Sequence, residues 1–128
     1  MPNKQPVTLI ATLGSEPQVI TAAYDLLTRQ DAPIDRVSVV HTVAPGTSIE
    51  QAVEILVEVF NSPPYSGRIE FALHPLYDDT NRPLSDVETP AATQAVFRAL
   101  YGLVRQAKLD GMRVHLSIAG GRKSMAVF

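Results

Sequence analysis

The chain has 128 residues, of which 45% are hydrophobic and none is cysteine. This length predicts one domain over residues 1–128, and the lack of cysteine excludes disulfides and thiolate metal sites. The formal net charge of −2 and a pI of about 5.9 argue against a broad basic surface that binds long duplex nucleic acid.

No segment of the sequence predicts a membrane location. The first residues, MPNKQP, contain no apolar signal core, and no apolar run approaches the roughly 20 residues that span a bilayer. We therefore expect a cytoplasmic protein with no membrane partner.

Apolar runs alternate with segments of helical periodicity in the first half of the chain. The run Val7–Leu13 is β-rich and predicts a buried strand, and Pro17 suits the first turn of the helix that follows. A loop ahead of the next helix offers an N-cap at Thr47 or Ser48. The first half thus predicts strand, helix, strand and helix over residues 7–13, 17–30, 36–42 and 49–60.

The second half begins with an alternating strand over 68–73 and then has a long surface segment over 77–90. That segment contains two prolines and four acidic residues. Loops of this length are often functional. A helix over 91–109 and a strand over 112–119 follow, and residues 123–128 begin another helix. So short a helix is marginal, so we expect either a longer parent protein or a partner at this end.

This order of elements predicts an α/β fold. Strands that alternate with helices favour a Rossmann-like, mainly parallel sheet with helices on both faces and right-handed crossovers. In such sheets, ligands bind beyond the carboxyl ends of the strands. Three of these ends carry suitable residues, in the segments Thr12–Pro17, His41–Thr42 and Ala119–Ser124. Each leads toward a helix N-terminus, where free N–H groups favour phosphate.

The last of these segments has the densest group of potential phosphate ligands. Gly120 and Gly121 allow close backbone approach, while Arg122, Lys123 and Ser124 supply a planar fork of donors, a compact charge and a hydroxyl. The alternative interpretation is an ordinary strand-to-helix turn with solvated cations. The other two strand ends favour the phosphate site.

Several familiar sites do not fit. A phosphate loop requires glycine where the chain has Ile118, and no GxGxxG follows the first strand. The three histidines lack metal-ligand spacing, so we expect no metal site and no cofactor. The four acidic residues of segment 77–90 form no tight pair and predict a solvated loop; they are Asp78, Asp79, Asp86 and Glu88.

Four stretches, in order along the chain, resemble the CRISPR-associated Rossmann fold (CARF) proteins of type III CRISPR systems, and especially their stand-alone ring nucleases. They are TLGSEPQVI from Thr12, VVHT ending at Thr42, HPL from His74 and IAGGRKSM from Ile118. The resemblance implies a homodimer that binds one cyclic tetra- or hexa-adenylate across its two-fold axis. Some members only sense the ring. Others cut it without metal, through attack of each ribose 2′-hydroxyl on the adjacent phosphate.

The same resemblance implies the site residues. It assigns catalysis to Lys123 and to Ser15, the hydroxyl residue of the first loop. Where similar ring nucleases have a hydroxyl residue just before the proline, this chain has Glu16, and the family's later helix and strand are missing within residues 1–128. The ligand-binding residues are expected to be Thr12, Gly14, Glu16, Gln18, Thr42, Gly120, Gly121, Arg122 and Ser124.

Three functions therefore remain open. The first is a ring nuclease that ends type III CRISPR signalling, and the second is a non-catalytic sensor domain of a larger effector or regulator. The third is an unrelated α/β nucleotide-binding domain. Glu16 has two interpretations as well: a carboxylate that interacts with the helix dipole, or a general base for the 2′-hydroxyl.

Overall fold

Four parallel strands form the sheet of the computed structural model, which describes residues 5–14, 16–30, 33–85 and 89–118. Along the sheet the order is β3-β2-β1-β4, and every neighbouring pair is parallel. The strands are β1 (Val7–Thr12), β2 (Arg36–His41), β3 (Glu70–Pro75) and β4 (Arg113–Ser117). The helices are α1 (Gln18–Gln30), α2 (Ser48–Phe60) and α3 (Pro90–Leu109).

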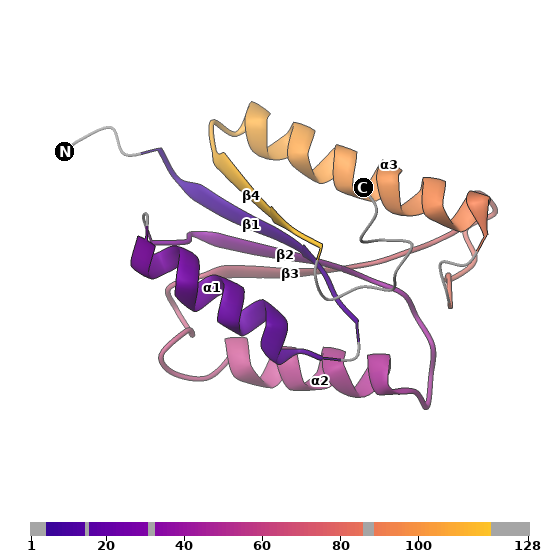
Figure 1. The fold of residues 1–128 in the computed structure, drawn as a ribbon, viewed down its shortest axis with the longest axis horizontal. Coiled ribbons are helices and arrows are strands. Elements are labelled where there is room, and N and C mark those ends of the chain that lie inside the picture. Colours follow the sequence, from indigo (N-terminus) through magenta and orange to yellow (C-terminus); the bar gives the residue numbers. More distant parts are fainter. Residues whose placement is uncertain (1–4, 15, 31–32, 86–88, 119–128) are drawn as a thin grey trace.

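The three helices cover the two faces of the sheet, α1 and α2 on one side and α3 on the other (Figure 1). The fold is therefore the α/β, Rossmann-like arrangement that the sequence predicts. Side chains alternate along a strand, so Leu9 of β1 lies under α1 and Ile10 lies under α3. Because helices cover both faces of the sheet, every residue of β1 is buried. Parallel strands covered on both faces need this continuous apolar sequence.

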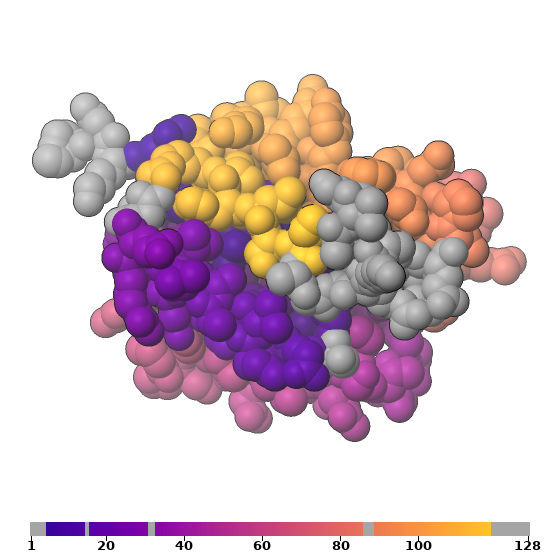
Figure 2. All heavy atoms as spheres, viewed as in Figure 1, coloured from indigo at the N-terminus to yellow at the C-terminus, as the bar shows by residue number. Residues whose placement is uncertain are grey.

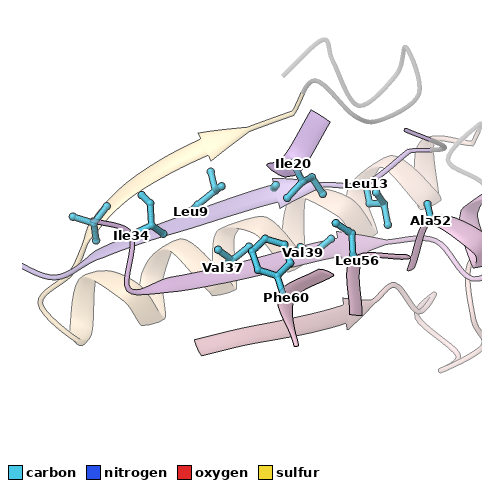
Figure 3. Packing of buried hydrophobic residues seen from close by; sticks show 11 residues of the cluster. Leu9, Leu13, Ile20, Ile34, Val37, Val39, Ala52, Leu56 and Phe60 are labelled. Carbon is cyan, nitrogen blue, oxygen red and sulfur yellow. The ribbon is translucent and has the colours of Figure 1, made fainter. Parts of the chain in front are cut away.

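The core on the α1 and α2 side is the larger of the two and is drawn in Figure 3. Leu9, Val37 and Val39 rise from the central strands toward Ile20 of α1 and Leu56 of α2. Its outer end is aromatic, since the ring of Phe60 stacks on that of Phe71 with centroids 4.6 Å apart. The smaller core under α3 is formed by Ile10, Val40, Leu76, Ala92, Val96 and Leu100.

Most element bounds agree with the sequence prediction to within one residue. The third strand is the clearest exception, because it runs over 70–75 and not over 68–73. A turn that closes between Arg68 N–H and the Tyr65 carbonyl delays its start, and Gly67 in that turn has φ +77°. The strand continues through His74, which pairs in register with Val40.

The long segment after β3 is partly ordered by a turn. Tyr77 and Pro83 form an antiparallel bridge, and the Asp78 side chain accepts hydrogen bonds from the backbone N–H groups of Thr80 and Arg82 at 2.8 and 2.9 Å. These bonds hold the pKa of the Asp78 carboxyl below its usual value. Asp78 is therefore the internal acceptor of a tight turn as well as a loop residue. Asp86 and Glu88 lie outside the described residues.

Within the described ranges, no helix is both long and apolar enough to cross a bilayer. The segment 123–128, for which the sequence predicts the start of a helix, lies outside these ranges, as does the end of the predicted fourth strand at Ala119.

Candidate functional site

The carboxyl ends of the four strands lie along one edge of the sheet, as the parallel pairing requires. Thr12 of β1 pairs in register with Val40 of β2, which in turn pairs with His74 of β3. On the other side of β1, Ala11 pairs with Ser117 of β4. Neighbouring strands are about 4.8 Å apart, so these ends form a continuous row. We call this row, with the loops that leave it, the carboxyl edge.

Thr12 is the most unusual residue of the carboxyl edge. It is only 1% exposed, and its hydroxyl has no hydrogen-bond partner among the described residues. Its partner Val40 belongs to the core under α3, so the Thr12 side chain lies on that side of the sheet. A buried hydroxyl without a partner costs about 1–3 kcal/mol, and sites with such a cost are candidates for ligand contact.

The end of β2 supplies two further buried polar residues, His41 and Thr42. The His41 Nδ1 lies 2.8 Å from the backbone oxygen of Thr42. A carbonyl only accepts, so this contact places the hydrogen on Nδ1. The His41 backbone oxygen accepts from the N–H of Leu76 at 2.8 Å, which ties the end of β2 to the segment after β3. His41 therefore has a structural role. Its hydrogen bond occupies one acceptor position of the Thr42 carbonyl.

His74 was not predicted as a site residue. Its Nε2 is buried and has no partner among the described residues. Burial lowers the pKa of the His74 imidazole, and the charge that His41 carries when protonated lowers it further. His74 is therefore neutral at pH 7. The periodicity of the sequence does not reveal that this histidine is buried. The sequence shows only a histidine at the end of a strand, and its register with Val40 comes from the structure.

The loop between β1 and α1 is anchored at both ends. The N–H of Leu13 donates to the Val40 carbonyl at 2.9 Å, and Gly14 behind it is buried. At the other end, the Gln18 side-chain amide donates to the Glu16 carboxylate at 2.6 Å. Both of these side chains are exposed. Glu16 thus lies two residues before α1, in the place expected of a carboxylate that interacts with the helix dipole.

The helix starts at the carboxyl edge differ in their capping. At α1, the N–H groups of Val19 and Ile20 already donate to the carbonyls of Glu16 and Pro17. At α3, the hydroxyl of Thr89 accepts from Ala92 N–H at 3.0 Å.

At α2, Thr47 is the N-cap residue, as predicted, yet its side chain makes no cap hydrogen bond and donates to the Ala44 carbonyl. The N–H groups in the first turn of α2 therefore donate no hydrogen bond to the side chain of the cap residue.

The predicted site residues fall into two groups. Thr12, Gly14, Glu16, Gln18 and Thr42 are described, and all lie at the carboxyl edge. The others lie outside the described residues: Ser15, Gly120, Gly121, Arg122, Lys123 and Ser124. The chain leaves β4 at this edge, since Ser117 and Ile118 precede them. Among the described residues, no group of three histidine or acidic side chains is placed to hold a metal ion.

An open groove of about 560 Å³ reaches the carboxyl edge at its β4 end, where Ser117 and Ile118 line it. It runs between α1 and β4, and its lining is mostly apolar, with Leu26, Leu27 and Leu116 prominent. Apolar walls do not solvate phosphate, so the groove does not suit a polyanion. The carboxyl edge is the better candidate site.

Comparison with known sequences supplies the family. No curated protein matches the chain. The family described as CRISPR-associated protein NE0113 matches residues 16–128, which is most of the chain and includes α1 to β4 and the segment Gly120–Ser124. The chain therefore belongs to the CRISPR-associated protein NE0113 family.

Proposed function

We propose that this chain is a CARF-like domain that binds cyclic oligoadenylate at the carboxyl edge of its sheet. The observation that carries the proposal is the group of polar features at the ends of adjacent strands: the unpartnered hydroxyl of Thr12, the Glu16–Gln18 pair before α1, and the N–H donors at the start of α2. Membership of a CRISPR-associated family supports a ligand that belongs to CRISPR signalling.

The ligand chemistry fits a chain with little net charge. A ring of four or six adenylates carries only four or six phosphates, which local N–H groups and a few cations can bind without a broad basic surface. The Thr12 hydroxyl can donate to a phosphate oxygen and also accept from an adenine or ribose donor. His74, neutral at pH 7, can do the same through its two ring nitrogens.

Cleavage is the second part of the proposal. The ribose 2′-oxygen attacks the adjacent phosphorus, the bond from phosphorus to the 5′-oxygen breaks, and the 5′-oxygen takes up a proton. The 2′-hydroxyl loses its own proton, and a 2′,3′-cyclic phosphate is left. Negative charge builds on the phosphorus-bound oxygens, and the Lys123 ammonium offsets it in this proposal. Ser15 is the hydroxyl residue that, in this proposal, orients the reacting groups.

A non-catalytic sensor is the second candidate. The observation that favours it is the state of Glu16, whose carboxylate is held by the Gln18 amide at the position where similar ring nucleases have a hydroxyl residue. In that case the ring would bind at the same edge and remain intact.

The deciding experiment incubates the purified protein with cyclic tetra-adenylate in EDTA and resolves the products. Linear tetra-adenylate and the Lys123→Ala variant serve as controls. Conversion of the ring to species ending in a cyclic phosphate supports the nuclease. Binding without conversion supports the sensor, and an absence of both refutes the proposal.

We also propose a symmetric homodimer with the two carboxyl edges adjoining. A ring with rotational symmetry is matched most simply by an isologous two-fold site. Sedimentation velocity with and without ligand tests this, and a monomer under both conditions would contradict it.

A further inference from the structure

The outward face of α2 is acidic. Glu50, Glu54 and Glu58 repeat every four residues and are all exposed, and the helix contains no basic residue. Ile55 and Val57 flank this row and are 49% and 36% exposed. The surface combines three negative charges with two apolar side chains.

The outward face of α3 has the opposite character. Arg98, Arg105 and Lys108 are exposed there, and the helix contains no acidic residue. Tyr101 and Leu109 lie on the same face and are 71% and 70% exposed. At 100° per residue, these five positions fall within about 100° of one another around the helix. Exposed aromatic and arginine side chains together are typical of interface centres.

Most of the charges on the two helices have no partner among the described residues; Glu50 differs, because its carboxylate accepts from the Gly46 N–H at 2.9 Å. Among the described residues, Arg98, Arg105 and Lys108 form no ion pair, and neither do Glu54 and Glu58. The spacing also corresponds. Glu50 to Glu58 spans about 12 Å along α2 at 1.5 Å per residue, and Arg98 to Lys108 spans about 15 Å along α3.

We infer that the α3 face of one copy of this chain docks on the α2 face of a second copy. The charge complementarity and the matched rows of exposed apolar residues identify the occupant as another copy. The two helices lie on opposite sides of the sheet, and Figure 2 shows α2 in magenta and α3 in orange at opposite margins of the molecule. A contact between different faces is heterologous, so it leaves one free α2 face and one free α3 face and extends the assembly head to tail.

The contact is separate from the proposed ligand-centred dimer. It uses the outer faces of the helices, whereas the carboxyl edge lies at the strand ends. A ligand-bound symmetric dimer would carry two free α2 faces and two free α3 faces, so the head-to-tail contact would join dimers into longer assemblies.

The test measures mass by sedimentation velocity, without ligand, over a series of protein and salt concentrations. The native chain should grow beyond a dimer as its concentration rises at low salt, and high salt should reverse this growth because it screens exposed charges. Two charge-reversed variants should each lose this growth: Glu54→Lys with Glu58→Lys on α2, and Arg98→Glu with Arg105→Glu on α3.

Mixing the two variants identifies the geometry. The α2 variant keeps a native α3 face and the α3 variant keeps a native α2 face, so an equimolar mixture should gain mass that neither variant gains alone. A chain with all four reversals should regain self-association. The control Arg29→Glu with Arg68→Glu changes the net charge by the same amount as the α3 variant, but at other exposed positions, and should associate as the native chain does. Circular dichroism checks that each variant is folded.

The association constant of each separate variant should fall by about tenfold or more. A native chain whose mass is independent of protein and salt concentration would overturn the inference. So would a mixture that gains no mass over its two components, provided that both are folded.

Discussion

Replacing Thr12 by valine should make the protein more stable and weaken its binding of ligand. Valine has nearly the shape of threonine but no hydroxyl, and the Thr12 hydroxyl is buried without a partner among the described residues. Removing such a group recovers about 1–2 kcal/mol of the unfolding free energy. For a chain of this length, that corresponds to a rise of roughly 3–8 °C in Tm.

The matched control is Thr8→Val on the same strand and the same side of the sheet. Thr8 is also 1% exposed, but its hydroxyl donates to the Arg36 carbonyl at 3.2 Å. This substitution should lower the unfolding free energy by about 0.5–1.5 kcal/mol, since a made hydrogen bond is lost. Thr8 lies four residues from Thr12, about 13 Å along the strand, so ligand affinity should not change.

Urea unfolding and calorimetry with cyclic tetra-adenylate measure both effects. We expect opposite signs for the two stability changes and a loss of affinity in Thr12→Val alone. If both substitutions destabilise equally and neither alters affinity, the Thr12 hydroxyl has a structural partner and the argument for it as a ligand contact is refuted.

The remaining predictions concern three other positions. Lys123→Ala should slow single-turnover cleavage by about a hundred- to thousand-fold, the usual cost of losing one preorganised charge contact. Arg122→Ala should affect affinity more than rate. Near-normal cleavage by Lys123→Ala would remove the proposed mechanism. Glu16→Gln should leave cleavage within a few-fold of the native rate, and a loss of cleavage with binding retained would instead support the general base. His74 has a pKa below its usual value of 6.5 in the fold, so the unfolded chain binds the proton more readily. The unfolding free energy should therefore fall as the pH drops below about 6.5, and it should fall less in His74→Gln. Identical pH profiles for the two proteins would contradict this assignment.

The elements of the fold were predictable because each has a clear local signal. Val7–Leu13 is too short and too continuously apolar for an amphipathic helix, and the helical periodicity between residues 90 and 109 ends at Asp110–Gly111, where Gly111 has φ +75°. The start of β3 was misplaced because Arg68 and Ile69 continue the alternating pattern. Their turn is fixed by hydrogen bonds that no sequence pattern shows.

The position of the carboxyl edge could be predicted from the sequence, but the burial and hydrogen bonding of its residues could not. The parallel sheet requires that Thr12 and Thr42 lie at the same edge, and the structure agrees. Whether a hydroxyl there is satisfied depends on register and on the packing of α3, which tertiary structure alone decides. His74 illustrates the same limit, since its burial follows from pairing with Val40. The opposite charges of α2 and α3 were legible in the sequence, but their position on opposite faces required the sheet order.

Titration calorimetry with cyclic tetra- and hexa-adenylate is the strongest test of whether the carboxyl edge binds cyclic oligoadenylate. We expect saturable heat with at least one ring, a stoichiometry of one ring per two chains, and a shallow salt dependence because few phosphates are contacted. Absence of heat with both rings, from protein that is folded by circular dichroism, would contradict it.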